Sequence, residues 1–255
     1  MSKPVGPNHS CEKWYDSAFQ GDYLRLYAHR DEAAARDEAS FIISQTAGKA
    51  RPRIVDIACG PGRHLLPFSR QAEFVVGVDR SAEMLSEAAR RLAQADCSAV
   101  LVRADMRHLP FRNQFTCATL LFTSFGYFPT DQENLSVIRQ ASCALRPGGV
   151  FWMDYINEPQ LRQTLEPYSR VTDGRRVIEE RRRITEDRRV EKQIRIIAED
   201  DEYCLNESVK LYSRRQIEDM FAHCDLKVCG LWGSFQGNEY RSDSPRLIIM
   251  GRKDD

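Results

Sequence analysis

A glycine-rich turn carries the residues whose types and spacing are best suited to chemistry. It reads "DIACGPG" and contains Asp56, Ala58, Gly60 and Gly62. Small residues at three of these positions allow a ligand to lie against bare backbone, and Asp56 adds a carboxylate at the end of an apolar run. Such a turn suits a nucleoside with a charged amino-acid tail, which backbone amides and acids would hold.

The spacing of this turn excludes two common nucleotide sites. A dinucleotide fingerprint, G-x-G-x-x-G, has its third glycine where this chain has Leu65, counted from Gly60, or Arg63, counted from Ala58. No G-x-x-x-x-G-K-[ST] pattern occurs in the sequence, which excludes a P-loop.

Two further carboxylates follow short apolar stretches. Asp79 ends "VVGVD", where an acid can accept hydrogen bonds from both ribose hydroxyls, and Asp105 ends "LVRAD", where it could accept one from the exocyclic amine of adenine. Each acid alone could instead cap a helix. Because the carboxyl ends of parallel strands meet at one edge of a sheet, the acids and the turn together predict a nucleoside site.

The elements that would position these acids alternate along the first half of the chain. Apolar runs predict strands at "RIVDIAC", "FVVGVD", "AVLVRAD", "FTCATLLF" and "VFWMDYI". Helices are predicted at "GRHLLPFSRQA", at "SAEMLSEAARRLAQA" with Ser81 as its N-cap, and at "DQENLSVIRQASCAL", which "RPGG" closes. This alternation indicates a parallel sheet covered on both faces. A helix, "SRRQIEDMFAHC", and the strands "LKVCGLWG" and "RLIIMGR" complete the fold.

A different pattern begins near residue 168 and ends near residue 212. Apolar and charged residues alternate in "VIEERRRI" and "VEKQIRI", which predicts inserted antiparallel strands. The arginines of this segment are interleaved with glutamates and aspartates. We therefore interpret it as a solvated, salt-bridged sheet face, with a surface for an anionic substrate as the alternative.

The composition of the whole chain limits the classes of function. The 255 residues include 37 basic and 37 acidic side chains, whereas a nucleic-acid binder usually has a basic excess. No apolar run approaches the ~20 residues of a membrane span, and the first residues lack the apolar segment of a signal peptide. We therefore expect a cytoplasmic protein with neither a membrane nor a nucleic acid as partner. The eight cysteines form no C-x-x-C pair, so we expect reduced thiols that act as small hydrophobes, and no metal site.

At these residues the sequence resembles the class I S-adenosylmethionine-dependent methyltransferases. "VDIACGPG" looks like their first motif, "GVDRSAEML" their second, and "RADMRHLPF" the segment that flanks adenine. "FTCATLLFTSFGYF" and "LRPGGVFWMDYIN" are similar to their fourth and fifth strands. "WYDSAFQGDYLRLYAHRD" and "SPRLIIMGRK" resemble a small-molecule branch, which includes the glycine/sarcosine N-methyltransferases and the aminosugar N,N-dimethyltransferases. Ala58 stands where many members have glycine.

The resemblance implies a fold and a domain layout. The fold would be α/β, a Rossmann-like sheet of seven mostly parallel strands with helices on both faces, the last strand antiparallel, plus the inserted antiparallel β segment. A single methyltransferase domain would span residues 1–255. It would have an N-terminal helical lid at about 10–48, a core at about 50–157 and 213–255, and inserted strands at about 168–212. An edge of the inserted strands could form a homodimer.

The resemblance also implies S-adenosylmethionine as methyl donor, S-adenosylhomocysteine as product and a small-molecule acceptor, with nitrogen as the first choice of acceptor atom and oxygen or carbon as alternatives. The residues expected to bind the donor are Tyr15, Tyr23, Arg30, Asp56, Ala58, Gly60, Gly62, Asp79, Arg80, Met84, Asp105 and Met106. The glycine turn would contact the methionine part, and Asp79 with Arg80 the ribose. Asp105 with Met106 would flank the adenine, and Arg30 would bind the donor's carboxylate.

Methyl transfer from a sulfonium needs no catalytic triad, because alignment of the reactants alone can supply about 7–11 kcal/mol. The catalytic base is therefore unassigned, with Tyr127, His64 and His108 as candidates. The segments "TSFGYF" and "DYINE" are expected to line the acceptor side. Three alternatives stay open: a nucleic-acid methyltransferase, which the neutral charge opposes; a nucleotide-cofactor oxidoreductase, which the glycine spacing opposes; and a regulatory protein that only binds the donor.

Overall fold

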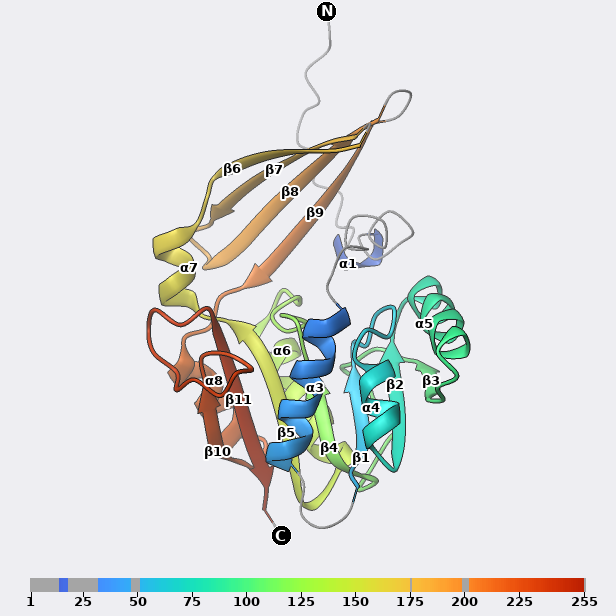
Figure 1. Cartoon of the computed structure of the whole chain (residues 1–255). Helices are drawn as coiled ribbons and strands as arrows, with labels where there is room; N and C mark the ends of the chain where they lie inside the picture. The colour runs from blue at the N-terminus through green and yellow to red at the C-terminus, as the bar shows by residue number, and fades with distance from the viewer. Residues whose placement is uncertain (1–13, 18–31, 47–50, 175, 199–201, 255) are drawn as a thin grey trace, which may run out of the picture.

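The computed structural model describes residues 14–17, 32–46, 51–174, 176–198 and 202–254. These residues form two separate β-sheets, a larger one surrounded by helices and a smaller one that lies over its upper edge (Figure 1). The chain enters the smaller sheet after residue 164 and leaves it at residue 210.

The larger sheet has seven strands. Their order is β10 (Leu226–Trp232), β11 (Arg246–Lys253), β5 (Leu145–Ile156), β4 (Phe115–Leu120), β1 (Arg53–Ile57), β2 (Phe74–Asp79) and β3 (Val100–Arg103). β11 pairs antiparallel with both β10 and β5, and the other pairings are parallel. The predicted fold class, a mostly parallel seven-stranded sheet with its last strand antiparallel, is confirmed.

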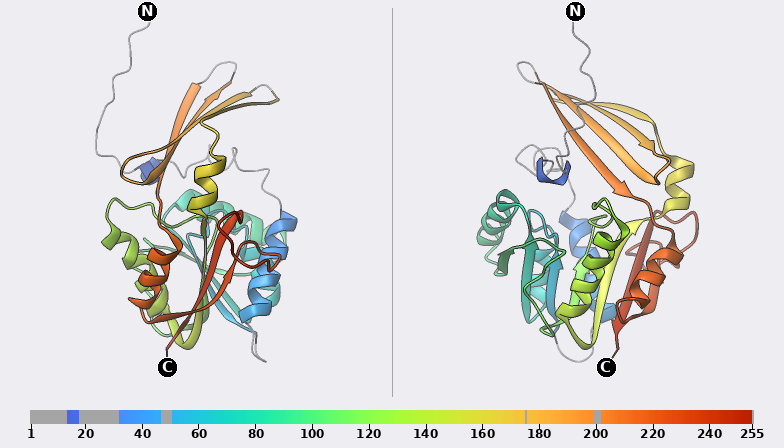
Figure 2. Two further views of the ribbon diagram at one scale, coloured as in Figure 1. Left: turned by 90° about the vertical axis from the view of Figure 1, so that its left-hand side faces the viewer. Right: turned by 180° about the vertical axis from the view of Figure 1, so that it is seen from behind.

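Helices cover both faces of this sheet (Figure 2). On one face α3 (Glu32–Thr46), α4 (Leu65–Gln71) and α5 (Ala82–Gln94) share a core that contains Ile42, Phe68 and Ala88. On the other face α6 (Asp131–Ala144) and α8 (Arg214–Ala222) share a second core. Ser81 is the N-cap of α5, as predicted, since its hydroxyl accepts a hydrogen bond from the Met84 amide.

One boundary differs from the prediction. The segment "RPGG", which was expected to close α6 as a loop, belongs to β5. Leu145 pairs with Phe115 and Val150 with Cys117, so the segment bulges out between these two pairs. A bulge keeps the backbone in the ladder at both ends, so the glycines interrupt the pairing without ending the strand.

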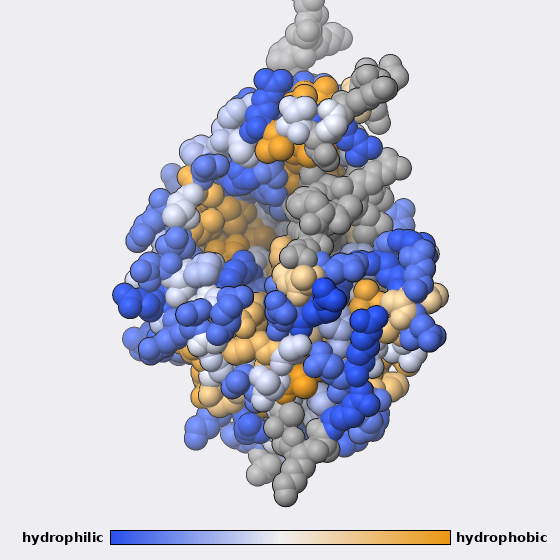
Figure 3. All heavy atoms as spheres, in the orientation of Figure 1, coloured by the Kyte–Doolittle hydropathy of each residue, from blue (hydrophilic) through white to orange (hydrophobic). Residues whose placement is uncertain are grey.

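The smaller sheet is antiparallel, with the order β6 (Tyr168–Asp173), β7 (Arg176–Ile184), β8 (Arg189–Ile197) and β9 (Glu202–Lys210). A short helix, α7 (Glu158–Thr164), leads into it, and α1 (Trp14–Ser17) contacts β9. One face of this sheet carries a small apolar cluster around the buried Ile194 and Ile196, beside the ion pair of Lys192 with Glu180. Figure 3 shows apolar side chains gathered in a hollow between the two sheets, below a largely hydrophilic surface.

The outer face of the smaller sheet is held by cross-strand ion pairs. Arg183 pairs with Glu191 at 2.7 Å, and Arg195 with Glu202 at 2.8 Å. This arrangement confirms the interpretation of a solvated, salt-bridged face.

The described cysteines are all free thiols, and their burial is mixed. Cys59, Cys117 and Cys224 are buried, as expected of small hydrophobes, whereas Cys204 and Cys229 are exposed. Among the described helices, none has the length and apolar character needed to cross a bilayer.

Gly77 in the middle of β2 lets the turn after β1 pack against the sheet. A Cβ atom there would lie 2.6 Å from Leu65 Cδ1 and 2.9 Å from Cys59 Sγ. We expect Gly77→Ala to lower the free energy of unfolding by about 1–3 kcal/mol, because both neighbours must shift. Urea denaturation measures this, and adding Cys59→Ala should recover part of the loss. An unchanged midpoint in the single variant would contradict the assignment.

Candidate active site

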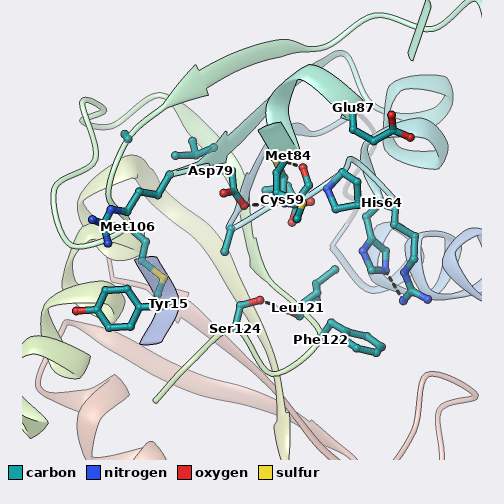
Figure 4. A pocket seen from close by; sticks show the side chains of 18 of the residues that line it. Tyr15, Cys59, His64, Asp79, Met84, Glu87, Met106, Leu121, Phe122 and Ser124 are labelled. Carbon is teal, nitrogen blue, oxygen red and sulfur yellow. Dashed lines mark hydrogen bonds between the residues drawn. The ribbon is translucent and has the colours of Figure 1, made fainter. Parts of the chain in front are cut away.

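A cavity of about 390 Å³ opens at the carboxyl ends of four adjacent parallel strands (Figure 4). Its walls include Asp56 of β1, Asp79 of β2, Asp105 just after β3, and Leu121 and Phe122 just after β4. This is the edge at which open α/β sheets bind ligands. The volume lies within the range of small-molecule sites, roughly 300–1,000 Å³.

The structure brings most of the predicted residues together here. Those that line the cavity are Tyr15, Asp56, Ala58, Gly60, Asp79, Arg80, Met84, Asp105 and Met106. Tyr23 and Arg30 lie outside the described residues, so their predicted contacts stay predictions.

Gly62 does not line the cavity. A Cβ atom at Gly62 would lie 3.0 Å from the Cβ of Ala88, so this glycine lets α5 pack closely against the turn. This packing accounts for the glycine, and the predicted contact of Gly62 with the donor stays a prediction.

The glycine turn reverses direction through alternating left-handed residues. Ala58, Gly60 and Gly62 have φ angles of 55°, 54° and 80°. Nothing lies within 4 Å of a Cβ built on Gly60. The left-handed backbone, and not crowding by neighbouring atoms, is therefore the reason for glycine at position 60. Ala58 adopts the same conformation at a cost of about 1–2 kcal/mol, which accounts physically for a preference for glycine at this position.

Asp79 ties the end of β2 to the turn. Its Oδ2 accepts a hydrogen bond from the Gly60 amide at 2.8 Å, and its Oδ1 accepts one from the Ser81 amide at 2.8 Å. Burial raises the pKa of Asp79, and these amides only partly offset the increase. A carboxylate has about four acceptor sites, so Asp79 keeps acceptor capacity beyond these amides, and it lines the cavity. The group can therefore accept two hydroxyl groups of a ligand.

Asp56 lies deeper in the same wall, with only 3% of its surface exposed. The Thr119 hydroxyl donates to its Oδ1 at 2.6 Å. Burial raises the pKa of Asp56, while the nearby His64 opposes the change. A cationic ligand beside Asp56 and Asp79 would stabilise both carboxylates, so this part of the cavity favours a ligand that carries positive charge.

Asp105 already has a partner. Arg107 donates from its backbone amide to Oδ1 at 2.9 Å and from Nη2 to Oδ2 at 2.7 Å. Burial raises the pKa of Asp105, but the hydrogen bonds from Arg107 outweigh it, and the net result is a lowered pKa. The Arg107 guanidinium also lies 4.2 Å from the centre of the Phe128 ring. A ligand group at Asp105 would therefore share that carboxylate with Arg107.

The three candidates for a catalytic base are not equally placed. Tyr127 and His64 line the cavity, whereas His108 does not. His64 is buried, and its Nε2 lies 2.6 Å from Glu38 Oε2, a residue of α3. Arg63 pairs with the same carboxylate and lies 5.1 Å from the Phe122 ring centre. Sequence reasoning missed Glu38, because a single glutamate on an amphipathic helix carries no spacing signal.

A strained turn presents Phe122 to the cavity. Phe122 and Thr123 both have left-handed backbones, with φ of 59° and 61°, and Phe122 keeps 44% of its surface exposed. Asp154 of β5 holds the turn, since its Oδ2 accepts from the Phe122 amide at 2.9 Å. Arg246 of β11 donates to Asp154 Oδ1 at 2.7 Å and to Thr123 Oγ1 at 2.6 Å.

The two segments expected on the acceptor side differ in their position relative to the cavity. Ser124, Tyr127 and Phe128 of "TSFGYF" line the cavity, but none of the "DYINE" residues does. Asp154 does not line the cavity, but it holds the Phe122 backbone amide. Strain of about 1–3 kcal/mol per left-handed residue persists only where the surroundings impose it, and here Asp154 and Arg246 do so.

Comparison with known proteins places this site in context. Residues 54–149 match the model of a family described as a methyltransferase domain. Over 136 residues the chain is 32% identical to the dTDP-3-amino-3,4,6-trideoxy-alpha-D-glucopyranose N,N-dimethyltransferase of Streptomyces venezuelae, a match that covers 53% of this chain and 55% of that protein. Over 128 residues it is 27% identical to the glycine/sarcosine N-methyltransferase of Halorhodospira halochloris, covering 49% and 48%. The chain thus spans about half the length of these curated relatives.

A solved structure extends the likeness to nearly the whole chain. An S-adenosylmethionine-dependent methyltransferase from Clostridium acetobutylicum ATCC 824 superposes with a TM-score of 0.80, covering 92% of this chain and 98% of that one. At 18% identity this likeness shows the fold alone. Together the matches confirm the resemblance to these N-methyltransferases that the motifs predicted.

The raised pKa values of the two buried acids predict a pH effect on stability. The pKa of Asp56 is higher in the native state than its ordinary value of 3.8. As the pH rises from about 4, the unfolded chain therefore loses this proton before the native state does. The free energy of unfolding falls over the pH range between the two pKa values. Asp56→Asn removes the ionisation while keeping an acceptor for Thr119. We expect its free energy of unfolding, relative to the parent, to increase as the pH rises above about 4. A difference that is independent of pH would contradict the raised pKa.

The support of the Phe122 turn gives a second prediction. Asp154→Ala leaves the Phe122 amide and the Arg246 guanidinium without this partner, which should destabilise the fold by about 2–4 kcal/mol in urea denaturation. Arg241→Ala is the control, because it breaks an exposed pair with Asp243 and should change stability by less than about 0.5 kcal/mol. Equal effects of the two variants would show that Asp154 does not hold the turn.

Proposed function

We propose, on the premise that residues 54–149 form a methyltransferase domain, that this protein transfers a methyl group from S-adenosylmethionine to the nitrogen of a small-molecule amine. When bound, that donor supplies an electrophilic methyl on a sulfonium. The work of the protein is then to hold the donor, to place a nitrogen lone pair in line with the methyl and to exclude water.

The observation that carries the proposal is the wall formed by Asp79, Gly60 and Asp56. Asp79 is fixed by two backbone amides and keeps acceptor capacity for a ribose diol. Gly60 leaves bare backbone at the cavity. Asp56 adds buried negative charge, which suits a donor that carries an ammonium and a sulfonium. The residues therefore fit an adenosyl sulfonium.

The far wall is suited to the acceptor. Leu121, Phe122 and Tyr127 give it an apolar and aromatic surface. An amine buried against such a surface loses hydration, which lowers its pKa and favours the neutral, nucleophilic form. A methylated ammonium product would contact the faces of aromatic rings, an interaction worth about 0.5–2 kcal/mol.

The choice of nitrogen rests on two supports. Both curated relatives described above are named as N-methyltransferases, one of an amino sugar and one of glycine and sarcosine. Among the described residues of the cavity, no catalytic base is assigned, and a nitrogen acceptor needs a base less than an oxygen or carbon acceptor does. His64 is engaged with Glu38, which leaves Tyr127 as the candidate nearest to the acceptor wall. A homodimer and a cytoplasmic location remain part of the proposal.

Asp79→Ala tests the donor site. It removes the acceptor for two ribose hydroxyls, each worth about 1.5–3 kcal/mol to a charged partner, so the affinity for S-adenosylhomocysteine should fall about 100-fold or more. Isothermal calorimetry measures this. Asp243→Ala, at an exposed acid in another loop, is the matched control and should leave the affinity unchanged.

The activity itself is tested with the parent protein. Incubation with S-adenosylmethionine and a panel of amino sugars, glycine and phenols should give a mass gain of one methyl on an amine and an equal amount of S-adenosylhomocysteine. Methylation confined to phenols would overturn the nitrogen assignment. Failure to bind S-adenosylhomocysteine at all would overturn the proposed function.

A further inference from the structure

Arg189, the first residue of β8, is a half-buried cation that binds only neutral oxygens among the described residues. Its Nε donates to the Ser208 hydroxyl at 2.8 Å, and its Nη1 donates to the Phe128 carbonyl at 3.2 Å. Its Nη2 reaches the carbonyls of Gly126 and Tyr127 at 3.2 Å and that of Ser208 at 2.9 Å. Burial lowers the pKa of Arg189. A guanidinium held by carbonyl dipoles without a carboxylate is unusual, because a buried charge is costly unless it is well bonded.

The carbonyls that Arg189 binds belong to the wall of the cavity. Three consecutive residues, 126–128, follow β4, and two of them, Tyr127 and Phe128, line the cavity. Ser208 lies on β9, opposite β8 in the smaller sheet. The guanidinium therefore joins two strands of the smaller sheet to a loop of the larger one.

A second contact brings the same loop against β9. The Lys210 amide donates to the Gly126 carbonyl at 2.8 Å. Gly126 has φ of 88°, and a Cβ atom there would lie 2.8 Å from the Lys210 carbonyl oxygen. Only a glycine allows this approach. The backbones of the loop and of β9 are therefore in direct contact at Gly126 and Lys210.

The loop also supports the aromatic residues of α1. Trp14 packs edge-on against Tyr127 with ring centres 4.9 Å apart, and Tyr15 packs against Phe128 at 5.4 Å. Tyr15 lines the cavity, and the Arg80 guanidinium lies 5.5 Å from its ring centre. A shift of the loop would therefore move residues on both the acceptor wall and the predicted donor wall.

We propose that Arg189 is a positioning residue, whose forked hydrogen bonds fix residues 126–128 and so couple the smaller sheet to the alignment of the two substrates. This inference rests on the proposed function. A planar guanidinium can serve these four carbonyls and a hydroxyl at once, whereas a lysine ammonium cannot match that geometry. The shape of the side chain, and not only its charge, is thus required.

The test compares Arg189→Gln, Arg189→Lys and, as control, Arg183→Gln, which removes an exposed cation of β7 that pairs with Glu191. Hydrogen–deuterium exchange is measured on peptides that cover residues 121–130 and 203–210, without any substrate. We expect exchange in these peptides to rise roughly tenfold in both Arg189 variants, because local opening becomes easier, and to stay unchanged in the control.

Kinetics supply the second readout. Misplacement of reacting groups by about 1 Å can cost roughly 100-fold, so we expect kcat to fall about 10–100-fold in both Arg189 variants. The affinity for S-adenosylhomocysteine should fall by less than tenfold, because Asp79 and Gly60 are untouched. A variant with only a structural defect would have a lower melting temperature. It would not show a large fall in kcat together with a small fall in the affinity for S-adenosylhomocysteine.

Each outcome decides the proposal. Unchanged exchange in Arg189→Gln, or full recovery of exchange and kcat in Arg189→Lys, would overturn it. If Arg189→Gln does not fold, Ser208→Ala removes one acceptor of the fork and should show a smaller increase of exchange in the same peptides; no increase would overturn the proposal. If the parent protein binds no S-adenosylhomocysteine, the proposed function fails, and exchange alone still decides whether Arg189 fixes the loop.

Discussion

The hydrogen bond from the Gly60 amide to the Asp79 carboxylate is the constraint on which the site depends. It joins the turn after β1 to the end of β2, across two neighbouring strands of the sheet. This one hydrogen bond both stabilises the left-handed backbone of the turn and holds the carboxylate at the cavity wall. Burial raises the pKa of this acid, and a ligand that donates hydrogen bonds or carries positive charge would favour its ionised form. The geometry of the turn and the position of this carboxylate at the cavity therefore depend on the same contact.

Much of the fold could be predicted from the sequence, because strands such as β1, β2 and β4 are continuous apolar runs between helices with an apolar stripe. The acids of the site could be found for the same reason, since each one ends such a run. The contacts that complete the site could not. Glu38 reaches His64 from a different helix, and Asp154 and Arg246 act on Phe122 from two other strands. Such contacts depend on how distant elements pack, and no local spacing encodes them.

The turn between β7 and β8 is tied to the segments that lead into and out of the smaller sheet. The Leu211 amide donates to the Arg188 carbonyl at 2.7 Å, and the Lys210 ammonium donates to the Asp187 carbonyl at 2.8 Å. Arg188 also pairs with the buried Glu158 of α7 at 2.7 Å. The turn between β7 and β8 is thus anchored beside both points where the chain enters and leaves the sheet. The inserted β segment therefore meets the cavity only indirectly, through the loop of residues 126–128 that Arg189 binds.

The left-handed turn at Phe122 and Thr123 has a consequence for how the protein can change over evolution. Its backbone is imposed by Asp154 and Arg246, which bind main-chain atoms and the Thr123 hydroxyl, and not by the identity of the side chain at position 122. Residue 122 can therefore be exchanged while the loop keeps its path. An exchange of residue 122 would alter one surface of the cavity and leave Asp56, Gly60 and Asp79 in place.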